Sequence, residues 1–505
     1  MLNSIRSSIK DTFIFGFGNL AVKVVGFILI PLYSDPKFFS VEDFGIIGIL
    51  DISGLVLISI IASPLPQSLT RWFWDKEHVK NQKQIFFMSL FSQTAISIFF
   101  CALLIPLSGQ ISTLIFGKTD WSYALTLIII SSSLQSVNNI LNTLTRLQSK
   151  SLLFTFANFS KLIIVLLLTI YFIVFRKMGI SGIYLAQVIG NLLFILLLSP
   201  YTIANCSVRF DFPTLKAMLI YGLPLILASF SGVLLNVIDR FSLNSLALLS
   251  SVAVYTLAFK ISSSLKLVFV DTIKLAIFPQ MIRRIDSPDN RRFYSKAMLY
   301  TSYIIMFGII GVSLFSPEVI KVITKNPELW SAYLLVPFLA LSTFFLNMRE
   351  VTIYGLIVTK KTGKLSLIVI VSSILNLALN LLLIPVWNAM GAAFATLISQ
   401  FFYWAVMHYT AQKAYFIPYE NRKLITILAL GSILSLIGLL LNDMIIIPRL
   451  LIKLCMLLSF PFILYFLNFY EPVELQAIKG FVNKWSSIKN LKDNLKSIKG
   501  IKENL

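Results

Sequence analysis

The charged residues of this chain lie almost entirely in short gaps between long apolar stretches. Of its 505 residues, 57% are hydrophobic. Apolar stretches of about 20 residues, the length that an α-helix needs to cross roughly 30 Å of hydrocarbon, recur about fourteen times. A single core shielded from water cannot bury so many of them. The pattern therefore predicts an all-α integral membrane protein that works at or across the bilayer.

Hydropathy and the positions of the charges predict fourteen transmembrane helices. We place them at residues 12–34, 43–64, 85–107, 121–144, 152–175, 180–203, 217–240, 251–278, 297–316, 331–358, 365–386, 391–412, 424–441 and 450–468.

The distribution of lysine and arginine predicts the orientation. With the N-terminus inside, the cytoplasmic segments hold 28 basic residues and the outside segments hold 7. Reversing the chain would invert this ratio, so the positive-inside rule places both ends in the cytoplasm. The net charge of +21 is then explained by topology and by contact with anionic membrane lipids, and nucleic-acid binding is not expected.

Neither the cysteines nor the two ends of the chain predict a catalytic or metal-binding site. Cys101, Cys206 and Cys455 are far apart and favour small core residues over a disulfide or metal set. The first dozen residues lead directly into a full-length span, which argues against a cleavable signal. Residues 471–505 alternate apolar and lysine faces at helical spacing, which predicts a basic amphipathic helix on the inner leaflet. A frayed basic tail that only enforces topology is the alternative.

The gap at 204–216 divides the first twelve spans into two sets of six. Because six is even, both sets enter the membrane in the same sense, as in a parallel pseudo-repeat. We therefore expect an N-lobe over 1–207, a C-lobe over 208–412, two further spans over 413–470 and a cytoplasmic tail over 471–505.

No motif predicts an enzyme or a bound cofactor. The chain lacks a Ser/His/Asp set, a phosphate-binding loop, zinc-ligand spacing and a dinucleotide fingerprint. If the chain is a pump, ATP does not drive it through this polypeptide.

Ionisable residues inside the spans carry the strongest functional signal. Eight are basic (Lys23, Lys161, Arg240, Lys260, Lys266, Lys274, Arg349, Lys453) and four are acidic (Asp51, Asp239, Asp271, Glu350). A cation facing lipid costs roughly 2.5–3.5 kcal/mol, so these side chains must snorkel, pair or line an aqueous cavity. Snorkelling accounts for Lys274, Lys453 and Arg240 near span ends. Lys23, Lys161 and Lys260 lie near the middle of their spans and predict a cationic cavity suited to an anionic substrate.

The eighth span places several charges together. At 100° per residue, Asp271 lies about 20° and Lys274 about 40° from Lys260 around the helix. Such a polar stripe on an apolar helix is typical of a solvated transport cavity. Asp51 is the best single candidate for a proton or sodium site, with an ion pair to Lys23 or Lys260 as the equal alternative.

The remaining acidic and basic residues leave similar choices open. Asp239 and Arg240 mark the outer end of the seventh span, and together with Asp271 they are candidates for ion coupling or for ion pairs. Arg349 and Glu350 can neutralise partners on other helices, and Arg349 is a further candidate for holding an anionic substrate.

Several segments, taken in order, resemble the Wzx-type polysaccharide flippases of the MOP exporter superfamily, which also contains the MATE transporters. They are Asp11-Thr12, Phe15-Gly16, Gly26, residues 29–33 (LIPLY), 38–45 (FFSVEDFG), 69–73 (LTRWF), Asp239-Arg240-Phe241, 252–260 (VAVYTLAFK), 376–385 (NLALNLLLIP) and 390–396 (MGAAFAT). The likeness covers nearly 400 residues. Departures are Val252-Ala253 in place of Val-Gly, and Asn388-Ala389 in place of Tyr-Gly.

The resemblance implies two six-helix lobes around a central cavity and alternating access. It implies a bacterial inner-membrane protein that moves undecaprenyl-diphosphate-linked oligosaccharide from the cytoplasmic to the periplasmic leaflet, for O-antigen, capsule or another surface polysaccharide. Proton or sodium coupling, and partnership with a polysaccharide polymerase and a chain-length regulator, are further family expectations.

Four other functions are alternatives to this one. A lipid II flippase of the same superfamily stays open. A drug or cation antiporter needs an acidic cavity, whereas this chain predicts a basic one. A membrane glycosyltransferase or polysaccharide polymerase needs a large outside loop, and the longest outside gap is about fifteen residues. A structural scaffold would not need charged faces inside its spans.

Overall fold

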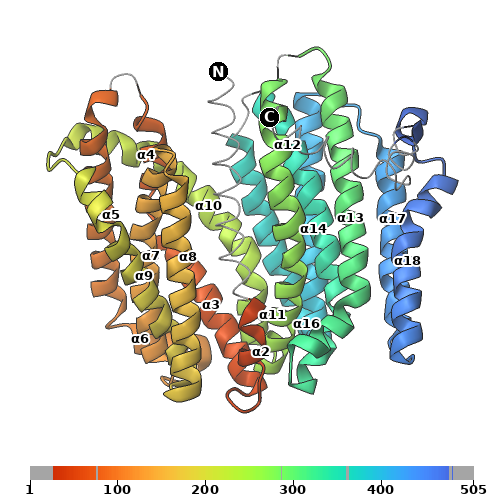
Figure 1. Cartoon of the computed structure of the whole chain (residues 1–505), viewed down its shortest axis with the longest axis horizontal. Coiled ribbons are helices and arrows are strands. Elements are labelled where there is room, and N and C mark those ends of the chain that lie inside the picture. Colours follow the sequence, from red (N-terminus) through yellow and green to blue (C-terminus); the bar gives the residue numbers. More distant parts are fainter. Residues whose placement is uncertain (1–26, 76–77, 286, 360–362, 477–479, 481–505) are drawn as a thin grey trace, which may run out of the picture.

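A computed structural model describes residues 27–75, 78–285, 287–359, 363–476 and 480 of the chain. This part is helical and contains no β-strand (Figure 1). Its helices are α2 (Ile30–Tyr33), α3 (Val41–Ile61), α4 (Leu65–Trp72), η1 (Val79–Asn81), α5 (Gln82–Leu104), α6 (Ser108–Phe116), α7 (Ser122–Leu147), α8 (Ser151–Ile170), η2 (Tyr171–Phe175), α9 (Gly179–Ala204), α10 (Phe212–Leu246), α11 (Leu249–Leu265), η3 (Lys266–Val270), α12 (Asp271–Arg283), α13 (Asn290–Ile323), η4 (Pro327–Leu334), α14 (Val336–Thr352), α15 (Tyr354–Val358), α16 (Gly363–Ala414), α17 (Asn421–Ile437), η5 (Gly438–Leu441) and α18 (Ile446–Phe466).

The all-helical membrane class is confirmed, whereas the count of fourteen spans is not. Ten helices of the described residues are long and apolar enough to cross a membrane, or eleven if the bent pair Pro327–Leu334 and Val336–Val358 is one span. Part of the difference is α16, where the spans predicted at 365–386 and 391–412 are joined across a kink at Asn388. The span predicted at 12–34 falls mostly outside the described residues.

Local signals in the sequence explain several boundaries. Ser40 and Asp43 form a reciprocal capping box at the start of α3. Asp211 caps α10 by accepting a hydrogen bond from the backbone N–H of Thr214. At the kink in α16, a Cβ on Gly391 would lie 2.3 Å from the carbonyl oxygen of Leu383, so only glycine fits this turn.

The helices form two groups that meet at one end of the molecule (Figure 1). A single buried cluster joins α3 to α11 there, including Phe44, Ile47, Ala253 and Leu257. Towards the other end, where α4 and α12 lie, the first group has its own core around Phe86 and the second has a separate core of α11–α18. The two groups of helices, which we call the two lobes below, thus pack against each other at the end that the sequence predicts to be periplasmic.

Two glycines allow α3 and α11 to approach closely at this shared end. A Cβ on Gly45 would lie 2.3 Å from the carbonyl oxygen of Leu249, and one on Gly48 would lie 2.5 Å from the Thr256 hydroxyl. An ion pair between Lys325 and Asp35 (2.6 Å) joins the second group to the first nearby. The hydrogen bond from Lys325 and the positive charge lower the pKa of Asp35.

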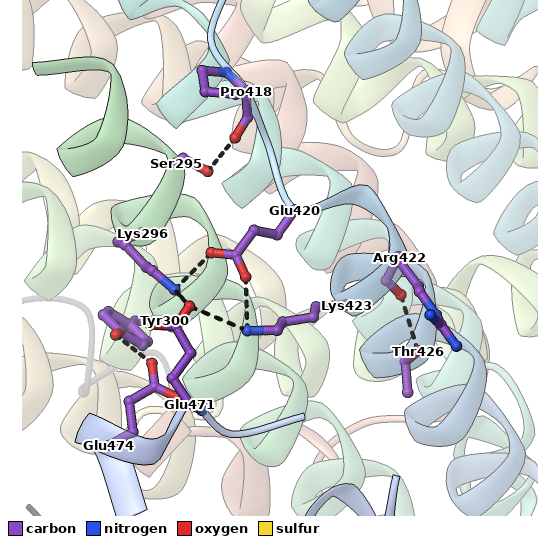
Figure 2. Close-up of polar contacts among 10 residues, drawn as sticks. All are labelled: Ser295, Lys296, Tyr300, Pro418, Glu420, Arg422, Lys423, Thr426, Glu471 and Glu474. Carbon is purple, nitrogen blue, oxygen red and sulfur yellow. Dashed lines mark hydrogen bonds and ion pairs between the residues drawn. The ribbon is translucent and has the colours of Figure 1, made fainter. Parts of the chain in front are cut away.

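Ion pairs fasten the segment after α18 to the second group (Figure 2). The ammonium of Lys296 on α13 lies 2.7 Å from Glu420 and 2.5 Å from Glu471, and Lys423 on α17 contacts the same two carboxylates. The hydroxyl of Tyr300 donates to Glu474. Most of the tail predicted to form an amphipathic helix lies outside the described residues, which include only 471–476 and 480 of it.

The far end of α18 is fastened by buried charge. Glu318 on α13 pairs with Arg449 (2.8 Å) and Lys453 (2.9 Å), and Lys453 is 0% exposed. The expectation that Lys453 snorkels to the interface is therefore wrong, because its ammonium is neutralised inside the protein instead. Lys274 likewise pairs with Glu350, at 2.8 Å.

Candidate functional site

The ion pair between Lys260 on α11 and Asp51 on α3 joins the two groups of helices. The Lys260 Nζ atom lies 3.6 Å from Asp51 Oδ2, and the two side chains are 22% and 35% exposed. Tyr184 on α9 donates its hydroxyl to Asp51 Oδ1 at 3.3 Å. Lys260 also lies over the ring of Phe44, at 5.6 Å from its centroid. Asp51 thus pairs with Lys260, one of the two partners that the sequence offered for it.

Lys161 on α8 is held by neutral groups. Its ammonium donates to Gln135 Oε1 and to Asn191 Oδ1, both at 2.5 Å, and lies 5.9 Å from the centroid of the Phe194 ring. No carboxylate of the described residues pairs with it. Asn191 in turn donates to Ser131, so the amides that hold the lysine are themselves fixed in position.

Asp51 and Lys161 line one cavity between α3, α7, α8 and α9. Its volume is about 360 Å³, within the usual range for small-molecule sites. A second cavity of about 260 Å³ follows α3 and α7 towards α4 and is lined by Ser59, Asn139 and Arg146 among others. Gln135 of the first cavity donates to Asn139 of the second at 3.1 Å. The two cavities therefore follow one polar face of α7.

Asp239 on α10 forms a separate buried cluster. Its carboxylate is 1% exposed and accepts hydrogen bonds from Tyr255, Asn380 and Thr396, each at 2.7 Å. These donors come from α11 and from both arms of α16. Three neutral donors keep a buried carboxylate solvated. The Oδ1 atom of Asn380 is buried with no hydrogen-bond partner in the described part of the chain.

Arg240 does not share this cluster. Its guanidinium lies 4.5 Å from the centroid of the Phe259 ring and donates to the Asn236 carbonyl. Both Asp239 and Arg240 are buried, so the alternative that the pair simply marks the outer end of a span does not describe their positions.

Arg349 belongs to a third group of charges. Its guanidinium pairs with Glu350 at 2.9 Å and lies 4.3 Å from the centroid of the Tyr403 ring, and Glu350 also pairs with Lys274. Two cations thus share one carboxylate, as predicted for neutralisation across helices. Arg349 also donates to Gln400 on α16.

The predicted polar face of the eighth span is interrupted. A π-helical turn, η3, separates Lys260 on α11 from Asp271, the first residue of α12. A π-turn has more residues per turn than an α-helix, so the step of 100° per residue does not hold across it. Asp271 is partly buried. Lys23, the other predicted cavity lysine, lies outside the described residues.

Sequence reasoning missed the neutral partners of these charges, namely Gln135, Tyr184, Asn191, Tyr255, Asn380 and Thr396. One signal was available. Ser131, Gln135, Asn139 and Thr143 recur every four residues in an apolar span, which places them on one helical face.

A protein-family model described as "Polysaccharide biosynthesis protein" matches residues 37–332, more than half of the chain. No curated protein sequence matches the chain significantly. Among solved structures, it is similar to the lipid II flippase MurJ in an inward closed conformation, with a TM-score of 0.73 and 13% identity over 90% of this chain and 99% of that one.

MATE transporters are also similar. A multidrug resistance MATE family transporter of the MOP superfamily, in an inward-facing conformation, gives a TM-score of 0.62 and 16% identity over 79% of this chain and 94% of that one. The Vibrio cholerae MATE transporter VcmN gives 0.53 and 16% identity over 81% and 96%. These likenesses establish a shared fold.

Proposed function

Because the chain belongs to the polysaccharide biosynthesis protein family, whose fold it shares with lipid and drug transporters, we propose that it is a flippase for lipid-linked oligosaccharides. The cargo is an undecaprenyl-diphosphate-linked repeat unit, moved from the cytoplasmic to the periplasmic leaflet of a bacterial inner membrane. Both termini are cytoplasmic in this proposal. The moved unit then serves a polysaccharide polymerase and its chain-length regulator.

The observation that carries the proposal is the Lys260–Asp51 pair between the lobes. A diphosphate brings concentrated negative charge, which Lys260 can bind once Asp51 is displaced from it. Lys161, Lys23 and Arg349 supply further positive charge for the diphosphate or for acidic sugars. Since the pair joins α3 to α11, exchange of Asp51 for the cargo would loosen the lobes and permit rocking between inward-open and outward-open states.

The test is the loss of surface polysaccharide in a Lys260→Ala strain. We expect the polymer to disappear while the protein still inserts at normal abundance. The control is Lys150→Ala, which removes an exposed lysine at the start of α8. Normal polymer in the Lys260→Ala strain would argue against the role of the pair.

We further propose that Asp239 couples transport to a proton or sodium gradient. The Asp239 carboxylate and the hydroxyls of Tyr255 and Thr396 lie within hydrogen-bond distance of one another, and such oxygen atoms suit a small hard cation. In Asp239→Asn, which keeps the shape but removes the charge, transport in vesicles should no longer respond to an imposed gradient. An unchanged response would assign the coupling elsewhere.

A lipid II flippase is the second candidate, supported by the match to almost the whole length of MurJ. Expression of this chain in cells depleted of their own lipid II flippase separates the two. Survival of those cells would favour lipid II. Lysis, together with rescue of a surface-polysaccharide mutant, would favour the oligosaccharide.

A further inference from the structure

The two cavities along α7 have a composition that the diphosphate does not require. Their polar lining consists mainly of hydroxyls and carboxamides, among them Ser59, Asn139 and Gln187. Such groups both donate and accept hydrogen bonds, and so match the alternating donors and acceptors of sugar hydroxyls. A diphosphate only accepts at these sites and would favour arginine and lysine.

The cavities lie next to each other. Ile58 lines the first and Ser59 the second, and the Gln135–Asn139 hydrogen bond joins their walls on α7. Each is too small for a complete lipid-linked oligosaccharide, but together they extend away from the Lys260–Asp51 pair along α3 and α7. A glycan attached to a diphosphate at Lys260 would have to follow such a path.

Three charged side chains interrupt this neutral lining: Asp51, which pairs with Lys260, Arg146 in the second cavity, and Lys161 in the first. Of the described residues, no carboxylate pairs with Lys161. An ammonium has three hydrogen-bond donors, and the two amide oxygens of Gln135 and Asn191 use two of them. Neutral partners orient the ammonium without neutralising it. Lys161 is partly buried, and a cation removed from water without a counter-ion is unfavourable, so an anionic ligand group is stabilised here more than at an exposed lysine.

We propose that these cavities bind the glycan part of the cargo and that Lys161 recognises a carboxylate on one of its sugars. The substrate class is thus narrowed to oligosaccharides that contain an acidic sugar, such as a hexuronate. This inference rests on the proposed function. Two sources could supply the anion at Lys161, the sugar carboxylate or the diphosphate, and the probes below separate them.

The test measures binding of three probes to the purified full-length protein in nanodiscs. They are farnesyl diphosphate, its glucosyl conjugate and its glucuronosyl conjugate, of which the last two differ only in the carboxylate. We expect the wild-type protein to bind the glucuronosyl probe at least about tenfold more tightly than the glucosyl probe. Lys161→Gln should abolish this preference and leave binding of farnesyl diphosphate unchanged.

Three variants make the result specific. Lys161→Arg keeps the charge and should retain much of the preference, and the exposed Lys150→Gln should behave as wild type. Asn139→Leu should weaken both sugar probes but not farnesyl diphosphate. The melting temperature of each variant verifies its folding.

The outcomes also separate the two proposals. Two results would overturn the acidic-sugar site but not the proposed flippase function. One is that the wild-type protein binds all three probes without a preference for the glucuronosyl probe, and the other is that Lys161→Gln weakens binding of all three probes equally. If the wild-type protein binds none of the probes, both proposals fail.

Discussion

The close approach of α3 and α11 gives a sharp prediction for Gly45. In Gly45→Ala, the new Cβ would lie 2.3 Å from the carbonyl oxygen of Leu249, whereas real Cβ contacts stay beyond 3.0 Å. That oxygen belongs to the backbone and cannot rotate away. The two helices must therefore separate by several tenths of an ångström. Overpacking of this kind costs about 1–3 kcal/mol, which shifts a two-state equilibrium by roughly 5- to 150-fold away from the packed state.

The assay is disulfide cross-linking across the same end of the molecule. Asp35→Cys and Lys325→Cys replace an ion pair that joins the two lobes, in a background where Cys101, Cys206 and Cys455 are serine. Adding Gly45→Ala should slow the formation of this disulfide by roughly 5- to 150-fold, because the two lobes spend less time packed together.

The matched control is the same substitution at Gly109 on α6, where nothing lies within 4 Å of the new Cβ. If Gly45→Ala cross-links as fast as Gly109→Ala and melts at the same temperature, the close packing of α3 on α11 is refuted.

Two further predictions concern the charge clusters of the second lobe. Glu318→Gln should destabilise the protein by about 3–5 kcal/mol, because it leaves Arg449 and Lys453 buried without a counter-ion, and a melting temperature equal to wild type would contradict this. Burial raises the pKa of Glu420, but hydrogen bonds from Lys296 and Lys423 outweigh it and lower the pKa overall. Its stabilising effect is therefore complete above its unfolded pKa and lost as the pH falls through the lower folded value. In Glu420→Gln, the melting temperature should fall less as the pH is lowered than it does in the wild-type protein. The same dependence of melting temperature on pH in both proteins would exclude this contribution.

The sequence predicted the all-helical membrane class because the length of an apolar helix that crosses a bilayer follows from the thickness of the hydrocarbon. The number of spans was not confirmed, since hydropathy does not show that the spans predicted at 365–386 and 391–412 join across a kink. The expectation that Lys161 and Lys260 have polar surroundings followed from the cost of a cation in hydrocarbon, and both ammonium groups have polar partners in the structure. Spacing alone could not decide whether Asp51 pairs with Lys260, because an ion pair between α3 and α11 depends on how two distant helices are rotated.

The partners of buried charges were the hardest to predict. Glu318 and Lys453 are 135 residues apart, and nothing local in either segment indicates the other. The π-turn at η3 gives no sequence signal as strong as proline, yet it changes which side chains share a face with Lys260.

The ion pair between Lys260 and Asp51 implies that, in the absence of cargo, a carboxylate of the protein itself occupies the proposed binding site for the diphosphate. A bare ammonium between two lobes would attract any small anion from the cytosol, whereas this one is already occupied by a tethered carboxylate. Inorganic phosphate or chloride must compete with a carboxylate that the fold holds next to the ammonium. In the proposed flippase, a cargo that gains additional contacts elsewhere would displace Asp51, and movement of the lobes without cargo would be suppressed.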